Sequence, residues 1–266
     1  MSYWIFISTM SSASSTYIDT GWYVSPEGKN ILSALLQRNG LKRRSFGMLE
    51  KPSLPPQTAP DEYQYKVYVS ARAGVGKTAT VAKLTGRDVP QNYVETPGIQ
   101  STCVYWPAKM TDIGKVVMFN LDMWDAGENS IRKFDHVLPA CQEGADAVIF
   151  LFSFIDRSSF LDIPQQMARV LDPNSNACRM VIGTKYDLHS RIEVTLRDLQ
   201  EFEQQWRLPV MRICNKTQTN QSGESELNEV APLLTAICEQ LWHRDQILTG
   251  KVVPSDLSVE PRITFC

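Results

Sequence analysis

The chain has 266 residues, of which 43% are hydrophobic, and its formal net charge is −2. This size allows one well-packed domain with tails or two small domains, and the charge argues against the basic surface of a nucleic-acid-binding protein. The six cysteines show no CxxC spacing, which argues against a zinc knuckle or a disulfide framework and favours a reducing cytosol. No apolar run approaches the ~20 residues that a membrane span needs.

Targeting and lipid-anchor signals are also absent from the sequence as given. Residues 3–7 are apolar, but the run is short and no basic region precedes it, so a signal peptide is not expected. Ser2 stands where N-myristoylation needs Gly, and Cys266 stands last, so no CaaX box is formed. Lipidation of Cys266 by another route stays open.

Residues 1–62 form a predicted amino-terminal extension. Residues 1–20 are rich in Ser and Thr and aperiodic, which predicts disorder. A short amphipathic helix follows, with Ser25 as N-cap, Pro26 as first residue and Gly40 beyond its end. This helix either packs on the main domain or binds a partner, and the sequence leaves both open. Its apolar stripe consists of Ile31, Leu32, Leu35 and Leu36.

A basic cluster and a linker lead into the main domain. The cluster Lys42-Arg43-Arg44 is expected to form a solvated face, and residues 52–60 form a Pro-rich linker of extended character. The main domain is therefore expected over residues 63–246. A flexible tail is expected over residues 247–266.

The stretch KVYVSARAGVGKTATVAKL, residues 66–84, predicts a strand, a tight loop and a helix. Such a loop turns successive backbone N–H groups onto a phosphate chain, and the helix dipole adds positive potential there. Lys77 would reach the β- and γ-phosphates, and the Thr78 hydroxyl would hold Mg²⁺. The first Gly of the pattern is Ala71 here, where a positive φ would be costly. The alternative is a Gly-rich turn without a ligand, which the order of strand, loop and helix disfavours.

The next segment supplies candidate metal ligands. Thr96 lies in a stretched loop, because Pro97 forces an extended backbone on it. An apolar strand and a hairpin near residues 111–114 lead into a second strand, which ends at Asp125. At a strand end beside the phosphate loop, Asp125 would hold Mg²⁺ through water; the alternative is a simple turn residue.

Strands and helices then alternate to the end of the domain. This alternation predicts an α/β fold with a mainly parallel sheet and helices on both faces. Ligands in such folds bind at the carboxyl ends of the strands, where all the candidate motifs lie. The predicted elements are a helix over 131–144, a strand over 147–154, a helix after Asp156, a strand over 179–184, a helix over 196–206, a strand over 209–214, a polar insertion over 217–226 and a helix over 227–242.

The segment Thr184-Lys185-x-Asp187 separates guanine from adenine. A carboxylate accepts from both the ring N–H and the exocyclic amine of guanine, whereas adenine would leave Asp187 unpaired. The aliphatic stem of Lys185 would cover the base face. Without a phosphate loop, Lys185 and Asp187 would be read as an ordinary surface pair.

The motifs VGKT, ETPGIQ, WDAGE, TKYD and CNK resemble, in order and place, the five guanine-nucleotide motifs of Ras-superfamily small GTPases. Within that superfamily the chain is most similar to the Rem- and Rab-like small GTPases of the ciliogenesis and planar-polarity effector complex. The stretches WPAKM, RKFDHVLPAC, FLFSFIDRSSF, EQLWHRDQ, EGKNILSALLQRN and SFGMLEKP carry this similarity, which covers roughly residues 22–246. It implies a small-GTPase-like P-loop domain, with a six-stranded mostly parallel sheet, one antiparallel edge hairpin and helices on both faces.

The resemblance also implies a ligand and partners. The ligand is GTP or GDP with Mg²⁺, and the partners are the Fuzzy and Inturned proteins. The expected place is the cytoplasm, at the ciliary basal body, in cilium formation, planar cell polarity, vesicle trafficking and exocytosis. The residues expected at the nucleotide are Ala73, Gly74, Val75, Gly76, Lys77, Thr78, Ala79, Thr96, Gly127, Thr184, Lys185, Asp187, Cys214, Asn215 and Lys216, with Thr78, Thr96 and Asp125 at Mg²⁺ and Glu128 as the catalytic candidate.

Several residues depart from the superfamily pattern and bear on hydrolysis more than on binding. The usual Asp-x-x-Gly is one residue shorter, Asp125-Ala126-Gly127, and Glu128 stands where a water-orienting Gln is expected. Three interpretations remain: a GTP-loaded binding module with slow turnover, a cycling hydrolase assisted by an activating protein, and a membrane-attached Rab-type carrier. Glu128 and the short loop favour the first. The other departures are Val89 near the base edge, Ala73 in the phosphate loop and Cys214 in the last motif.

A surface for protein partners is expected on residues 93–106 and 129–134. Val104 and Trp106 alternate with Tyr105 along the strand, so one set faces the core and the other is available to a partner. The alternative is that both aromatics pack on the protein's own amino-terminal helix.

Overall fold

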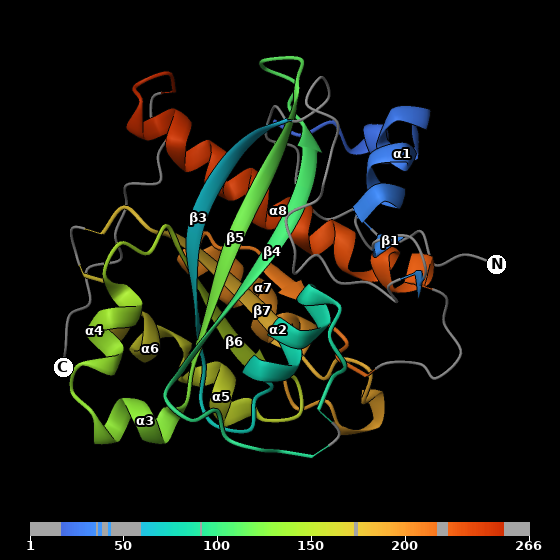
Figure 1. Ribbon diagram of the computed structural model, residues 1–266. Helices are drawn as coiled ribbons and strands as arrows, with labels where there is room; N and C mark the ends of the chain where they lie inside the picture. The colour runs from blue at the N-terminus through green and yellow to red at the C-terminus, as the bar shows by residue number, and fades with distance from the viewer. Residues whose placement is uncertain are drawn as a thin grey trace.

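The computed structural model describes residues 17–35, 37–38, 42–43, 60–90, 92–172, 175–216 and 223–252. Its centre is a six-stranded sheet in the order β4-β5-β3-β6-β7-β8 (Figure 1). β4 pairs with β5 antiparallel, and the other neighbouring strands run parallel, as the sequence predicts. The strands are β3 (Asp61–Ser70), β4 (Ile99–Lys109), β5 (Val116–Ala126), β6 (Ala147–Ser153), β7 (Cys178–Thr184) and β8 (Val210–Arg212).

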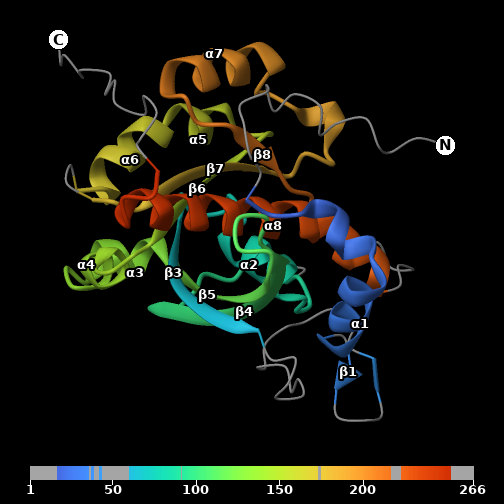
Figure 2. The ribbon, with the colours of Figure 1, turned by 90° about the horizontal axis from the view of Figure 1, so that it is seen from above.

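Helices cover both faces of this sheet. In Figure 2, α2 and α8 lie on one side of the strands, while α4, α6 and α7 lie on the other. The helices are η1 (Thr20–Val24), α1 (Pro26–Leu35), α2 (Lys77–Thr85), α3 (Glu128–Lys133), α4 (Val137–Gln142), α5 (Arg157–Leu161), α6 (Ile163–Val170), η2 (His189–Arg191), α7 (Leu196–Trp206) and α8 (Gly223–Leu248).

The side chains of the central strands alternate between two hydrophobic cores. On β3, Val67 and Val69 enter the core shared with α2 and α8, whereas Tyr68 enters the core shared with α4, α6 and α7. On β6, Ile149 faces the first core and Phe150 the second. All seven residues of β6 are buried, because a parallel strand covered on both faces has no solvent side.

The amino-terminal segment is part of the first core, so the disorder expected over residues 1–20 is wrong for residues 17–20, where Ile18 is anchored in that core. Ile18 forms a bridge with Met110 at the end of β4, and both side chains are fully buried. The Tyr23 hydroxyl accepts from Trp106 Nε1 at 3.0 Å, which ties η1 to the middle of β4. Ile31 and Leu32 of α1 also pack against this core. At these two residues the apolar stripe of the helix therefore packs on the main domain, which is one of the two alternatives that the sequence leaves open. Ser25 accepts from Gly28 N–H at 3.1 Å, as expected of the N-cap.

One predicted helix is two helices in the structure. The helix expected over residues 131–144 is divided into α3 and α4, because Phe134 adopts an extended backbone and ends α3. Pro139 explains the restart. Inside a single long helix it would lack the N–H that the preceding turn needs, whereas in α4 it lies in the first turn.

Three other elements have bounds that differ from the expectation. β3 begins at Asp61, before the stretch over residues 66–84 in which its strand was predicted, and β8 is shorter than the predicted strand over 209–214. α8 begins at Gly223, within the segment expected as a polar insertion, and runs to Leu248, beyond the predicted domain end. Pairing and packing with neighbours extend β3 and α8 past the ends of their apolar patterns.

Some expectations lie outside the described residues. They concern the start of the chain at 1–16, Gly40 and Leu36, most of the Pro-rich linker, most of the polar insertion and the tail from residue 253. Two short paired strands, β1 (Gln37–Arg38) and β2 (Lys42–Arg43), lie between α1 and β3 and include two residues of the basic cluster. Within the described ranges, every helix is too short or too polar to cross a membrane.

Candidate functional site

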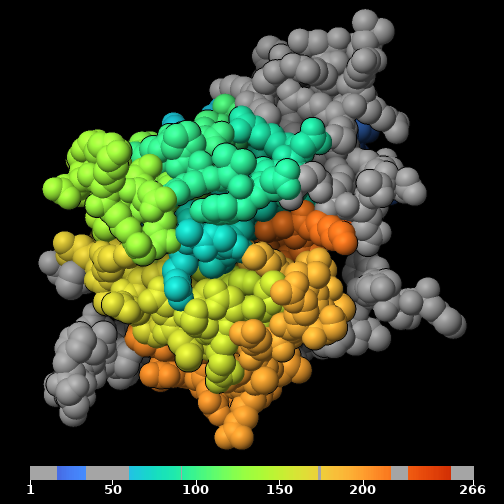
Figure 3. All heavy atoms as spheres, turned by 90° about the horizontal axis from the view of Figure 1, so that it is seen from below, coloured from blue at the N-terminus to red at the C-terminus, as the bar shows by residue number. Residues whose placement is uncertain are grey.

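The candidate residues gather at one edge of the sheet, where the parallel strands end. The phosphate loop (residues 71–78) follows β3, Gly127 follows β5, Thr184 ends β7, and Cys214 follows β8. Figure 3 looks onto this edge, where the cyan and teal segments of the first half of the domain meet the yellow and orange segments of the second. Ligand sites of open α/β sheets occupy this position.

The phosphate loop has the backbone of an anion cradle. Gly74 and Gly76 have φ of 75° and 115°, conformations that disfavour a Cβ, and Gly76 leads into α2 without a side-chain cap. The N–H groups at the start of α2 are therefore free of a side-chain acceptor at the cap. Ala71 does not have a positive φ, so the expected cost of replacing the first Gly is not incurred.

Lys77 is buried within the loop. Its side chain is 9% exposed, and Nζ donates to Ala71 O at 3.1 Å. Burial lowers the pKa of the Lys77 ammonium, and the carboxylates of Asp125, Glu128 and Glu95 oppose that shift. A lysine ammonium that is held in a desolvated loop attracts an anion more strongly than an ammonium that is fully hydrated.

Three oxygen-bearing side chains from three elements meet beside Lys77. The hydroxyls of Thr78 and Thr96 are 2.8 Å apart, and they donate to Asp125 Oδ2 at 2.5 and 3.1 Å. Asp125 is 1% exposed, and its second oxygen, Oδ1, has no hydrogen-bond partner among the described residues. The structure thus brings the three predicted metal ligands together.

The loop after β5 is joined to the segment around Thr96. Gly127 N–H donates to Gly98 O at 3.1 Å, and Asn129 N–H donates to Glu95 Oε1 at 2.7 Å. A Cβ at Gly127 would lie 2.1 Å from Thr96 O, so only glycine fits this approach. Hydrogen bonds therefore join residues 95–98 to residues 127–129, the segment that follows Asp125.

Glu128 does not stand free as a base. Its Oε2 accepts from Ala73 N–H at 2.5 Å, and Oε1 forms an ion pair with Arg132, one helical turn away. The carboxylate therefore lies against the phosphate loop, where its negative charge would oppose a third phosphate. Sequence reasoning placed Glu128 near the nucleotide but gave no sign of the contact with Ala73.

The candidate base-reading segment, residues 184–187, is anchored to the phosphate loop. Thr184 Oγ1 donates to Val75 O at 2.7 Å, and Lys185 Nζ donates to Gly74 O at 2.8 Å. Lys185 has a φ of 58°, a strained conformation that directs the chain away from β7 at this turn. Asp187 is partly buried on the same turn.

The last candidate motif approaches the phosphate loop from β8. Asn215 is 9% exposed and donates to Thr80 Oγ1 at 2.9 Å, whereas Cys214 and Lys216 are exposed. Burial raises the pKa of the Cys214 thiol, and the nearby Asp187 and Glu229 carboxylates add to the shift. At neutral pH, Cys214 is therefore less often in its reactive thiolate form than an ordinary cysteine.

The surface expected for partners is only partly available. Trp106 is fully buried beneath Tyr23, so this aromatic packs on the amino-terminal segment, as the alternative interpretation had it. Tyr105 is partly buried against the same core. In contrast, Tyr93 and Val94 are 66% and 74% exposed, and Phe134 is 44% exposed. The apolar side chains open to solvent flank the strand rather than lie on it.

Sequence reasoning missed three residues at this site. Glu95 binds Asn129, Arg132 pairs with Glu128, and Thr80 binds Asn215. The i,i+4 spacing of Glu128 and Arg132 is a signal that the sequence does offer. Glu95 and Thr80 carry no such signal, because their partners are distant in the chain.

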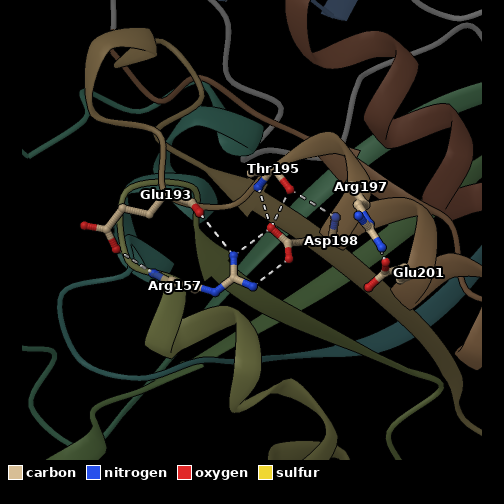
Figure 4. A network of polar contacts seen from close by, with 6 residues as sticks. All are labelled: Arg157, Glu193, Thr195, Arg197, Asp198 and Glu201. Atoms are coloured by element: carbon tan, nitrogen blue, oxygen red, sulfur yellow. Dashed lines mark hydrogen bonds and ion pairs between the residues drawn. The ribbon is translucent and has the colours of Figure 1, made fainter.

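A polar network beside the site fixes α5 to the start of α7 (Figure 4). Arg157 donates to both oxygens of Asp198, at 2.7 and 2.6 Å. Asp198 also accepts from Thr195 N–H at 2.8 Å, while Thr195 Oγ1 accepts from Asp198 N–H, which completes a capping box. These bonds, with Arg157 first, hold the pKa of the Asp198 carboxyl well below its usual range.

The residues present fit a nucleotide and Mg²⁺. Asp125 Oδ1 and Asn215 Oδ1 are buried without protein partners, as expected of groups that await a ligand. One carboxylate and two hydroxyls suit Mg²⁺, which takes the rest of its oxygen ligands from phosphates and water. The fit rests on these side chains and on the glycine backbone of the phosphate loop.

Comparisons with known proteins agree with this geometry. The Ras family model matches residues 66–228, which is more than half of the chain. The chain is 47% identical over 241 residues to Ciliogenesis and planar polarity effector 2 of Xenopus laevis, covering 88% of this chain and 96% of that protein. The human protein of that name is 46% identical over 235 residues, with 86% and 90% covered. The Danio rerio protein is 40% identical over 243 residues, with 91% and 93% covered. The chain belongs to the Ras family, and within it to the relatives that carry this name.

Proposed function

We propose that this chain is a guanine-nucleotide-binding switch that recruits protein partners when it holds GTP. The observation that carries the proposal is the meeting of Thr78, Thr96 and Asp125 beside a buried lysine in a glycine-rich phosphate loop. Lys77 would contact the phosphates, the three oxygen ligands would hold Mg²⁺, and Asp187 would read guanine. Bound Mg²⁺ would neutralise phosphate charge.

The proposal is tested by nucleotide binding. GDP and GTP with Mg²⁺ are expected to bind the full chain, and ATP is not, because Asp187 finds no pair of donors on adenine. Lys77→Ala should abolish binding, whereas Asp187→Ala should reduce the preference for GTP over ATP. Calorimetry that gives equal affinities for ATP and GTP would contradict the proposal. Glu201→Ala, at an exposed position on α7, is a suitable control.

The proposed conformational switch involves the two segments that hydrogen bonds join near Asp125, residues 95–98 and 127–129. Thr96 reaches Mg²⁺ and a γ-phosphate only when they are present, so GTP would order this segment and GDP would release it. The exposed Tyr93, Val94 and Phe134 belong to the segments that would change. We propose that they form part of the partner surface in the GTP state.

The relatives are named as effectors of ciliogenesis and planar polarity, which supports a role of this chain in those processes. The family resemblance points to Fuzzy and Inturned as partners, with a place in the cytoplasm at the ciliary basal body and a role in vesicle trafficking and exocytosis. Pull-downs should recover the partner with GTP-loaded protein, less with GDP-loaded protein, and less with Thr96→Ala. Equal recovery from all three would replace the switch by a constitutive scaffold.

A second candidate is a cycling GTP hydrolase of Rab type, which acts in membrane traffic without ciliary specificity. The contact between Glu128 and Ala73 disfavours it, because the residue at the catalytic position is engaged by the phosphate loop. Single-turnover hydrolysis, with and without an activating protein that supplies an Arg, distinguishes the two candidates.

A further inference from the structure

The hairpin of β4 and β5 reaches the candidate nucleotide site at one end and the amino-terminal segment at the other. β4 begins at Ile99, shortly after Thr96, and β5 contains Asp125 near its end. The two strands pair along their full length. The hairpin therefore connects two of the three candidate Mg²⁺ ligands to a turn about 30 Å away, since each strand rises ~3.3 Å per residue.

Residues 17–24, which we call the strap, fasten the far end of this hairpin. Asp19 N–H donates to Lys109 O at 2.8 Å, and Thr111 N–H donates to Tyr17 O at 2.8 Å. These two bonds flank the buried bridge between the strap and the end of β4. The strap thus adds a short antiparallel pairing to the outer edge of β4.

The strap is also bound to α8, and the blue amino-terminal segment runs alongside this helix in Figure 2. Tyr17 N–H donates to Glu239 Oε1 at 3.0 Å. Near the other end of the strap, the Tyr23 hydroxyl contacts both Trp106 of β4 and Thr235 of α8. The strap therefore connects the hairpin to α8 at two places.

α8 is itself anchored to the centre of the sheet. The Tyr65 hydroxyl of β3 donates to Asp245 Oδ2 at 2.7 Å, and Arg244 pairs with Asp146, the residue before β6, at 3.0 Å. β4, in contrast, is an edge strand in the six-stranded sheet of the described residues. Edge strands have ladder bonds on one side only and open more easily than central strands. The strap thus ties an edge strand to a helix that the central strands hold.

We propose that the strap is a regulatory clamp on nucleotide release. While it is closed, it holds the hairpin where Thr96 and Asp125 meet Thr78, and when it opens, bound guanine nucleotide leaves faster. Opening of the hairpin would displace Thr96 and Asp125 together, because both are continuous with it. A protein that removed the strap from β4 would therefore speed release from a distance. The inference rests on the proposed guanine-nucleotide binding and adds a control to it.

A reversible cross-link tests the clamp in the full chain. Ile18 and Met110 form a non-hydrogen-bonded antiparallel pair, in which Cα atoms are typically about 4.5 Å apart, a separation that a disulfide spans. The double variant Ile18→Cys with Met110→Cys is loaded with ribose-labelled fluorescent GDP and Mg²⁺, and release is followed after addition of excess GDP. We expect the oxidised protein to release the label at least about fivefold more slowly than the same protein after reduction. Wild-type chain given the same treatments controls for its six cysteines.

Loosening the strap should have the opposite effect. Glu239→Leu removes the acceptor of Tyr17 N–H, whereas Glu239→Gln keeps an oxygen that can accept. We expect Glu239→Leu to release the labelled GDP about fivefold faster than wild type, and Glu239→Gln to release it at the wild-type rate. Glu203→Leu is the matched control, because Glu203 also accepts from a backbone N–H, that of Val210 in β8, at the other edge of the sheet.

Hydrogen–deuterium exchange gives a readout that needs no nucleotide. In the nucleotide-free double variant, we expect the disulfide to slow amide exchange in residues 95–98, at the near end of the hairpin, relative to the reduced protein. A strap with a purely structural role would change exchange only near the cross-link, in residues 17–24 and 109–111.

The outcomes separate this inference from the proposed function. Equal release rates in the oxidised and reduced double variant would make the strap a structural support only. The same conclusion would follow if Glu239→Leu lowered the thermal midpoint but released GDP at the wild-type rate, or if Glu239→Gln released it as fast as Glu239→Leu. If the wild-type chain binds no labelled GDP, the proposed function fails, whereas slowed exchange in residues 95–98 would still support a strap that controls the hairpin.

Discussion

At the scale of single residues, Glu128 has the largest consequence for turnover. Its carboxylate accepts from Ala73 N–H in the phosphate loop and pairs with Arg132. Two negative charges about 4 Å apart repel each other by up to about 4 kcal/mol at an effective dielectric constant of 20. A carboxylate held at this loop thus opposes the charge that a γ-phosphate brings and that the transition state retains.

We therefore expect intrinsic GTP hydrolysis to be slowed by up to about a thousandfold relative to small GTPases with the usual Gln. Glu128→Gln removes the charge but leaves the shortened loop, so it should not restore the ordinary rate. The measurement is single-turnover hydrolysis of GTP preloaded on the protein. A wild-type rate equal to that of an ordinary Ras-like protein would refute this explanation.

At the scale of elements, the network around Asp198 holds α5 against the start of α7 (Figure 4). The pKa of Asp198 is lowered by the bonds with Arg157 and Thr195. Because the folded pKa lies below the unfolded pKa, which is about 4, the stabilisation is present above pH 4 and is lost as the pH falls through the folded pKa.

Asp198→Asn is therefore expected to lower the free energy of unfolding by about 1 kcal/mol near pH 7, a small value because this network lies near the surface. The difference between variant and wild type should shrink as the pH is lowered from 4 toward 2. Urea unfolding at a series of pH values measures it. Glu201→Gln, which affects only an exposed pair with Arg197, provides the control. A difference that does not change with pH would exclude the charged network as its source.

At the scale of the whole molecule, the amino-terminal segment completes the core that α8 and β4 share. Tyr23 connects the two, since its hydroxyl accepts from Trp106 Nε1 and lies 3.3 Å from the Thr235 hydroxyl. Burial raises the pKa of Tyr23, so its hydroxyl stays neutral and available as a hydrogen-bond partner at all physiological pH values. The domain that carries the phosphate loop therefore includes residues far upstream of that loop.

Tyr23→Phe should lower the free energy of unfolding by about 1–3 kcal/mol, because it leaves the buried Trp106 N–H without an acceptor. Chemical denaturation followed by tryptophan fluorescence measures the loss. The neighbouring Val24→Ala is the control, since Val24 is 70% exposed and its truncation should change stability by less than about 0.5 kcal/mol. Equal stability of Tyr23→Phe and wild type would mean that the segment does not stabilise the core.

Much of the fold was predictable from sequence, because local patterns decide it. A strand with a continuous apolar run, such as β6, and the helix with an N-cap at Thr195 have their signals within a few residues. The phosphate loop was predictable for the same reason. Its glycines, which allow the turn of the backbone, and Lys77, which supplies the charge, lie within a few residues of one another in the sequence. The division of α3 from α4 was not predicted, because it depends on the extended conformation of Phe134.

The sequence by itself determined the α/β order, the phosphate loop and the candidate base-reading segment, because each of these depends on residues close together in the chain. Only the tertiary structure decided that Trp106 is covered by Tyr23, that Glu128 contacts Ala73, and that the oxygen of Asn215 is buried and unpaired. These contacts join residues from separate elements. Their energies depend on distance and burial, which no local pattern of residues encodes.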